Sequence, residues 1–157
     1  MALRVLGIGS PFGDDQLGWE VIKLLQASQP LHHYIPHKLE LSHCDRPGLY
    51  LLELMRDARC VFLIDAIKTG SKIGTIHCFK NETIEGVGSA LSTHSIGMAE
   101  AMQMGRALQT LPKTVLLYGL EIGDVRSEWT MTAPIIEAIK ALSMRLEQDI
   151  LSLLSTH

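Results

Sequence analysis

Short apolar runs alternate along the chain with longer stretches in which apolar residues recur at helical spacing. This alternation is typical of an α/β domain in which helices cover a sheet. Cys60–Ile67 is apolar on both faces, which favours a central buried strand, whereas Gly74–Lys80 is less apolar and predicts a weaker strand. The five predicted strands are Leu3–Ile8, a segment within His37–His43, Cys60–Ile67, Gly74–Lys80 and Thr114–Ile122.

The intervening segments predict helices and loops. We expect helices at Gln16–Ser28, within Leu49–Asp57, at Ser95–Leu111, and from about Thr132, with Thr132 as the cap and Pro134 in the first turn. The most loop-like regions are Pro30–Pro36, Lys80–Thr93 and Gly123–Met131. Without an internal repeat or linker, the sequence predicts a single domain over residues 1–157. Its expected fold is a three-layer α/β/α arrangement with a central twisted, mostly parallel sheet of about five strands.

Composition narrows the class of protein. The chain has 157 residues, of which 46% are hydrophobic, enough for a real core. It shows neither a signal peptide nor an apolar run of membrane-spanning length, so we expect a cytoplasmic protein without a membrane partner. Cys44, Cys60 and Cys78 form no CxxC pair, so we expect reduced, mostly buried thiols. A net charge of −3 without a Lys/Arg cluster argues against nucleic acid as a partner.

Polar residues follow several predicted strands. Asp14 and Asp15 come after the first strand, and Asp65 lies near the end of the apolar run "CVFLID". His94 directly precedes a predicted helix, and Glu121 lies at the end of the last strand. Ligands of open α/β sheets bind beyond the carboxyl ends of the strands, so these side chains are expected at one edge.

Each of these residues also has a purely structural interpretation. An acid after the first strand can cap the next helix, and a lone histidine can simply begin a helix. Asp65 is harder to explain in this way, because an acid on a buried strand loses solvation unless something pairs with it. Two carboxylates and a neutral imidazole suit a divalent metal, without choosing between zinc, nickel, cobalt and manganese.

The glycines of "GIGSPFGDDQLG", Gly7 to Gly18, resemble a dinucleotide-binding fingerprint only in part. Phe12 stands where the third glycine is needed, and the two acids that follow would repel a pyrophosphate. We therefore expect a tight turn that brings the acids to the sheet edge. The opening "GIGSP" also resembles peptidyl-tRNA hydrolases, but acids follow instead of that family's His/Asn pair. A thiol nucleophile at Cys44 beside His43 lacks the rest of a cysteine-protease pattern.

Four segments in order carry a further resemblance: "GIGSPFGDDQLGWEVIKLL", "VFLIDAIKTG", "STHSIGMAEAM" and "YGLEIGD". With them, the chain resembles the hydrogenase maturation endopeptidases from Leu3 to about Leu142. The resemblance implies a single α/β domain that cleaves a C-terminal extension from the large-subunit precursor of a nickel-iron hydrogenase after nickel is loaded. The family's metal-contacting acid, aspartate and histidine fall on Asp15, Asp65 and His94, the same trio that the strand ends selected.

The sequence departs from the family pattern at three places. Ser10 replaces the usual Asn, Asp15 replaces the usual Glu, and the loop is one residue shorter. Where an Asp-Gly-Gly-Thr type motif is expected, the chain reads "SHCDRPGLYLL", so either His43 or Asp45 takes the place of that Asp. A His and a Pro in this region resemble the subgroup that serves bidirectional, NAD-linked hydrogenases.

The resemblance also implies that the protein needs no tightly bound cofactor. Asp15, Asp65 and His94 would contact the nickel of the precursor, in a site that zinc or cadmium could also occupy, and they would act as the catalytic residues of a monomeric, aspartic-type endopeptidase. Either the metal polarises a carbonyl or a water, or the carboxylates act as general base while the metal only docks the substrate. The alternative from another class is a non-catalytic, nickel-sensing accessory module.

Overall fold

Five strands form one sheet at the centre of the computed structural model, which describes residues 2–88, 97–123 and 130–156. The strand order is β2-β1-β3-β5-β4; β4 is antiparallel to β5 and the other neighbours are parallel. The α/β class, the mostly parallel sheet and the central place of Cys60–Ile67 are therefore confirmed. The strands are β1 (Leu3–Gly9), β2 (Leu39–Asp45), β3 (Cys60–Ile67), β4 (Ile76–Lys80) and β5 (Thr114–Glu121).

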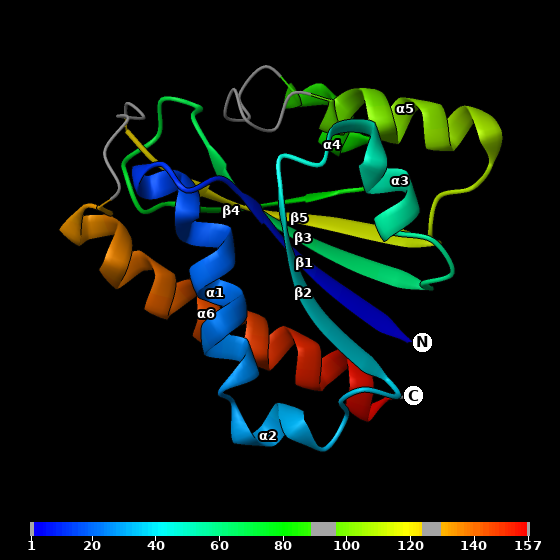
Figure 1. The fold of residues 1–157 in the computed structure, drawn as a ribbon, viewed down its shortest axis with the longest axis horizontal. Helices are drawn as coiled ribbons and strands as arrows, with labels where there is room; N and C mark the ends of the chain where they lie inside the picture. The colour runs from blue at the N-terminus through cyan, green and yellow to red at the C-terminus, as the bar shows by residue number, and fades with distance from the viewer. Residues whose placement is uncertain (1, 89–96, 124–129, 157) are drawn as a thin grey trace.

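Helices cover both faces of the sheet and complete three layers (Figure 1). One face carries α1, α2 and α6, and the other carries α3, α4 and α5. No helix in the described part of the chain has both the length and the apolar content needed to cross a bilayer. The helices are η1 (Gly13–Gln16), α1 (Leu17–Gln26), α2 (Gln29–His32), η2 (Gly48–Tyr50), α3 (Leu51–Leu54), α4 (Thr83–Gly86), α5 (Met98–Leu108) and α6 (Ala133–Ser155).

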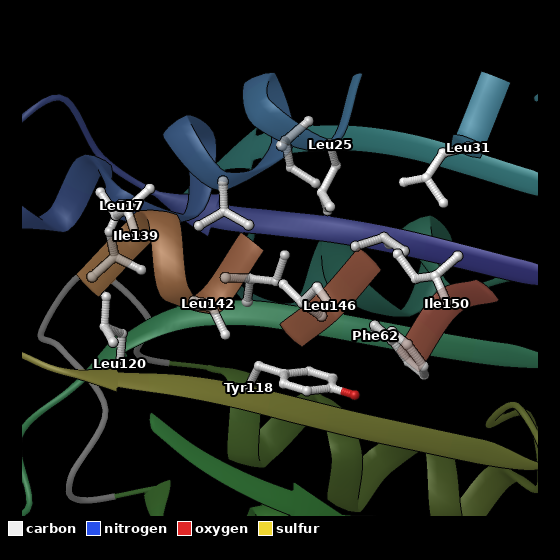
Figure 2. Close-up of a cluster of buried hydrophobic side chains, with 14 of the residues drawn as sticks. Leu17, Leu25, Leu31, Phe62, Tyr118, Leu120, Ile139, Leu142, Leu146 and Ile150 are labelled. Atoms are coloured by element: carbon white, nitrogen blue, oxygen red, sulfur yellow. The ribbon is translucent and has the colours of Figure 1, made fainter. Parts of the chain in front are cut away.

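The side chains of β3 alternate between two buried clusters, because successive residues of a strand face opposite sides of a sheet. Phe62 and Ile64 pack in the cluster that α1 and α6 cover (Figure 2). Val61 and Leu63 pack in the cluster on the side of α3 and α5. By the same alternation, Asp65 lies on the face of Val61 and Leu63, near the carboxyl end of the strand.

The structure differs from the predicted elements at two loops. A short helix, α2, lies at the start of the predicted loop Pro30–Pro36, and α4 lies within the predicted loop Lys80–Thr93. Each has four residues, too few to show a helical period. Of the helix predicted at Ser95–Leu111, the described part is α5, and most of Gly123–Met131 lies outside the described residues.

The cysteines are more exposed than expected. Cys44 and Cys60 are half-buried, but Cys78, on the edge strand β4, is exposed. The expectation of mostly buried thiols is therefore wrong for Cys78, because only β5 flanks its strand.

Candidate active site

The loop after β1 folds back tightly against the strand. A Cβ on Gly9 would lie 2.4 Å from the carbonyl oxygen of Asp15, so a larger residue does not fit there. Gly13 has a φ of 51°, in the left-handed region, directly before Asp14. The N–H of Ser10 donates to the carbonyl of Asp15 at 3.2 Å and closes the loop. The glycines therefore form the predicted tight turn that returns both acids to the sheet edge.

Asp15 is fully buried and only half satisfied. Its Oδ2 accepts a hydrogen bond of 2.6 Å from Oγ of Ser10, which is also fully buried. Its Oδ1 has no hydrogen-bond partner among the described residues. Because a buried carboxylate oxygen without a partner is costly, this atom is suited to a cation or to a donor from outside the described part of the chain.

Asp14 has a different, structural role. The N–H of Thr132 donates to its Oδ1 at 2.7 Å, and the Thr132 hydroxyl donates to its Oδ2 at 2.9 Å. Thr132 is the N-cap residue of α6, as predicted, but its own side chain makes no capping hydrogen bond. Both acids lie in the first turn of η1, where a negative charge is favoured, but neither η1 nor α1 has a side-chain capping hydrogen bond. Asp14 instead ties the first loop to the start of α6.

Asp65 lies at the same edge of the sheet as Asp15. The pairing of β1 with β3 ends at Gly7 and Ile64, so Asp65 comes directly beyond it, and η1 contacts β3. Asp65 is fully buried, and its Oδ1 accepts a hydrogen bond of 2.8 Å from the N–H of Ala66. The expectation that this acid is buried within the strand, and held by a partner, is confirmed.

Glu121 lies at the end of β5 and is also buried, but its carboxylate is saturated. Thr69 donates to it twice, from its N–H at 2.7 Å and from its hydroxyl at 2.6 Å, and His77 Nε2 lies 3.0 Å from Oε1. Burial raises the pKa of Glu121, but the hydrogen bonds from Thr69, His77 and Gly70 together lower it below the ordinary value. Glu121 therefore anchors the loop after β3 to the edge strand β4.

The end of β2 places both residues that could replace the family's Asp at this edge. His43 pairs in register with Gly7 and Asp45 with Gly9. His43 is exposed, with its ring 5.9 Å from that of Trp19, and Asp45 forms an ion pair with Arg46 at 2.5 Å. Asp45 is thus already neutralised by its neighbour.

Cys44 lies between these two residues and is half-buried. Burial, with a smaller effect of the Asp65 and Asp45 charges, raises the pKa of its thiol to about 12. A thiol with this pKa is protonated at neutral pH and is a poor nucleophile. The geometry therefore argues against a cysteine-protease role for Cys44.

His94 lies outside the described residues, so the structure does not test its place beside the two carboxylates. The described chain resumes at Gly97, whose backbone packs against that of Gly48, at the turn after β2. Within the described ranges, no group of three His, Cys, Asp or Glu side chains is arranged to hold a metal ion. The described part of the site therefore offers the two carboxylates of Asp15 and Asp65.

Sequence reasoning missed the residues that hold these acids. The sequence shows Ser10 only as a departure from the family pattern, and nothing in it marks Thr69 or His77 as a partner of Glu121. Their contacts join positions far apart in the chain, such as Thr69 with Glu121, which a local pattern does not reveal. One feature of the sequence could have indicated such partners: acids follow the apolar strands, and buried acids need polar groups to hold them.

Solved structures share this fold. The hydrogenase maturating endopeptidase HybD from E. coli matches with a TM-score of 0.80 at 22% identity, over 97% of this chain and 93% of that one. HybD from Thermococcus kodakarensis matches with a TM-score of 0.70 at 15% identity, over 94% and 98%. At these identities, the likeness establishes the α/β fold alone.

A family model described as hydrogenase maturation protease, HycI, matches residues 45–152, more than half of the chain. The chain belongs to the hydrogenase maturation protease family. This membership replaces the resemblance to peptidyl-tRNA hydrolases. The matched range includes Asp65 and position 94, whereas Asp15 precedes it.

Curated relatives carry related names. The hydrogenase expression/formation protein HupD of Thiocapsa roseopersicina is 27% identical over 122 residues, 76% of this chain and 53% of that protein. HupM of Azotobacter chroococcum mcd 1 is 23% identical over 126 residues, 78% and 58%. The chain thus spans a little more than half the length of these relatives.

Proposed function

We propose that this protein is an endopeptidase that removes a C-terminal extension from the nickel-loaded large-subunit precursor of a nickel-iron hydrogenase. Membership of the hydrogenase maturation protease family supports this activity. The observation that carries the site is the buried Oδ1 of Asp15, which has no partner among the described residues and lies at the carboxyl end of the sheet, where Asp65 lies near the end of β3.

The proposed recognition group is Asp15, Asp65 and His94, in contact with nickel that belongs to the precursor. Two carboxylates and an imidazole are suitable ligands for a divalent cation, including zinc or cadmium, and Oδ1 of Asp15, which lacks a partner in the described part of the chain, fits such a contact. The bound metal would supply polarisation of a carbonyl or water oxygen. No tightly bound cofactor of the protein's own is needed for this role.

The chain's own residues then perform two tasks. Ser10 holds one oxygen of Asp15, and the N–H of Ala66 holds one oxygen of Asp65, so both carboxylates keep fixed orientations. Both side chains are fully buried, so bulk water has little access to the two carboxylates. One of these carboxylates accepts a proton from the water that attacks the scissile peptide, as general base in an aspartic-type reaction.

We further propose that the protein acts as a monomer in the cytoplasm, without nucleic acid or a membrane as partner. The free cysteines suit a reducing compartment, and a net charge of −3 is unsuited to binding phosphates.

The test is incubation of the purified protein with the nickel-loaded precursor, followed by intact-mass measurement of the large subunit. We expect loss of a short C-terminal peptide. Binding without a change in mass would favour the nickel-sensing module instead. Asp65→Asn should abolish processing and keep the fold, and Asp57→Asn, an exposed acid, serves as the matched control. Retained processing by Asp65→Asn would contradict the proposed site.

A further inference from the structure

A groove runs beside the last turns of α6, at the opposite end of the sheet from Asp15. Its walls include Ala2, at the start of β1, and Thr156, after the end of α6. Phe62, Leu116 and Tyr118 supply its apolar floor. Residues of β3, β5 and β4 line it in turn, so the groove is about 10 Å wide across the strands.

The groove exists because the helices cover this face of the sheet unevenly. α1 and α6 pack over the middle strands, and Phe62 and Tyr118 lie at the margin of the cluster that they bury (Figure 2). Farther out, Leu116 on β5 is only half-buried, and Cys78 on β4 is exposed. Because Phe62 and Tyr118 are themselves buried, the surface left open beside the edge strand is supplied by Leu116 and Cys78.

Positive charge surrounds this apolar floor. Arg59, Lys113 and Arg145 line the groove, whereas Asp149 is the acid among its lining residues. The protein as a whole carries a charge of −3, so the groove has the opposite sign to the rest of the molecule. Arg59 and Lys113 form no ion pair with any residue in the described ranges.

The other two charged residues of the groove, Arg145 and Asp149, interact with Tyr118 and with each other. The hydroxyl of Tyr118 donates to Oδ2 of Asp149 at 2.8 Å, and the guanidinium of Arg145 lies 5.6 Å from the centre of the Tyr118 ring. Arg145 is also 3.8 Å from Asp149. Asp149 is thus paired with its neighbours. Arg59 and Lys113 remain available to interact with a bound partner.

We propose that this groove docks an acidic segment with apolar side chains on the hydrogenase precursor, remote from the scissile bond. The inference rests on the proposed function. Unpaired cations around an apolar floor complement such a segment, and a groove across three strands suits a polypeptide better than a small metabolite. The rise along β3 puts Cys60, at the groove, about 17 Å from Asp65. Binding here adds affinity for the precursor without touching the reacting atoms.

The experiment compares processing kinetics of the nickel-loaded precursor by wild type, Arg59→Glu/Lys113→Glu and the control Lys23→Glu/Lys140→Glu. Both double variants change the net charge equally and alter exposed side chains. We expect the groove variant to raise KM at least about fivefold at unchanged kcat. Charges at the rim of a docking surface contribute equally to binding of the substrate and of the transition state, so their loss affects KM alone. We also expect added salt to raise the KM of wild type more than that of the groove variant.

An unchanged KM in the groove variant, or an equal rise in the control, would overturn the docking inference while leaving the protease intact. If wild type does not cleave the precursor, the proposed function fails, and affinity of the same variants for the immobilised precursor then decides the groove by itself. The last measurement is sedimentation of the protein alone, which reports its oligomeric state. A wild-type dimer that Arg59→Glu/Lys113→Glu abolishes would assign the groove to a second copy of the chain and reject the precursor.

Discussion

Ser10 and Asp15 are hydrogen-bonded to each other inside the first loop, with 2.6 Å between Oγ and Oδ2 and both side chains fully buried. These are the two positions at which the loop departs from the family's usual Asn and Glu, and both departures shorten a side chain. Since the two residues are direct partners, the departures are best understood together. Ser10 fixes the shorter acid and leaves its other oxygen without a hydrogen-bond partner in the described ranges.

Ser10→Ala should weaken both the fold and the site. Removing the hydroxyl leaves Asp15 buried without its side-chain donor, so we expect the free energy of unfolding to fall by about 1–3 kcal/mol. Processing should slow as well, because the carboxylate loses its orientation. Denaturant titration and precursor cleavage measure the two effects, with Ser155→Ala, an exposed serine on α6, as control. A variant unchanged in both measurements would show that the contact positions nothing.

Asp14 and Asp15 should respond differently to substitution. Asp14→Ala removes the acceptor for the N–H and hydroxyl of Thr132, so we expect a loss of about 1–2 kcal/mol in stability, as for a lost helix cap. Asp15→Asn removes a buried, half-satisfied charge, so its stability should be equal to or higher than that of wild type.

Processing separates the same two variants in the opposite sense. Asp15→Asn should reduce it at least about 100-fold, whereas Asp14→Ala should retain most of it below its melting temperature. Thermal unfolding and cleavage assays on the same preparations decide the matter. If Asp14→Ala were the inactive variant and Asp15→Asn the destabilised one, the two roles would be exchanged.

Glu121 should make the free energy of unfolding depend on pH in the acidic range. Its pKa in the folded protein lies below its ordinary value of 4.5, so its stabilising effect is complete above that value and is lost as pH falls through the folded-state pKa. Glu121→Gln should lower stability by about 2 kcal/mol at pH 7, since hydrogen bonds to a charged group are lost. Below about pH 4.5 the difference from wild type should shrink.

Denaturation curves at several pH values measure this effect. Glu137→Gln is the matched control, because Glu137 is exposed and forms a surface ion pair with Lys140 on α6. A difference between wild type and Glu121→Gln that stays constant down to acid pH would contradict the role assigned to the ionised carboxylate.

Cys44→Ala should leave the chemistry intact. Burial raises the pKa of this thiol to about 12, so the thiolate needed for nucleophilic attack is absent at neutral pH. We expect kcat for precursor cleavage within about twofold of wild type, since the thiol takes no part in the reaction. Loss of cleavage in a variant that still folds would restore the thiol mechanism.

Much of the fold follows from periodicity alone. The run Cys60–Ile67 predicted β3 to the residue, because a strand buried on both faces leaves a continuous apolar signal. The short helices α2 and α4 could not be predicted, since four residues show no period and their start depends on local turns.

The sequence predicted where the two carboxylates of the site lie, but not the contacts that their side chains make. The rule for strand ends selected Asp15 and Asp65, and both lie at the carboxyl edge of the sheet. The different roles of Asp14 and Asp15 could not be predicted from the sequence. They depend on Thr132, which is distant in sequence and reaches the loop through the packing of α6. His94 stays a prediction, outside the described residues.

The link between the carboxylates and the precursor's metal is tested by one comparison, processing of nickel-loaded against nickel-free precursor by wild type, Asp15→Asn and His94→Ala. We predict that wild type shortens only the nickel-loaded precursor, that Asp15→Asn shortens neither, and that His94→Ala binds the loaded form more weakly. Equal cleavage of both precursors by wild type, or full cleavage by Asp15→Asn, would contradict recognition of nickel at this edge of the sheet.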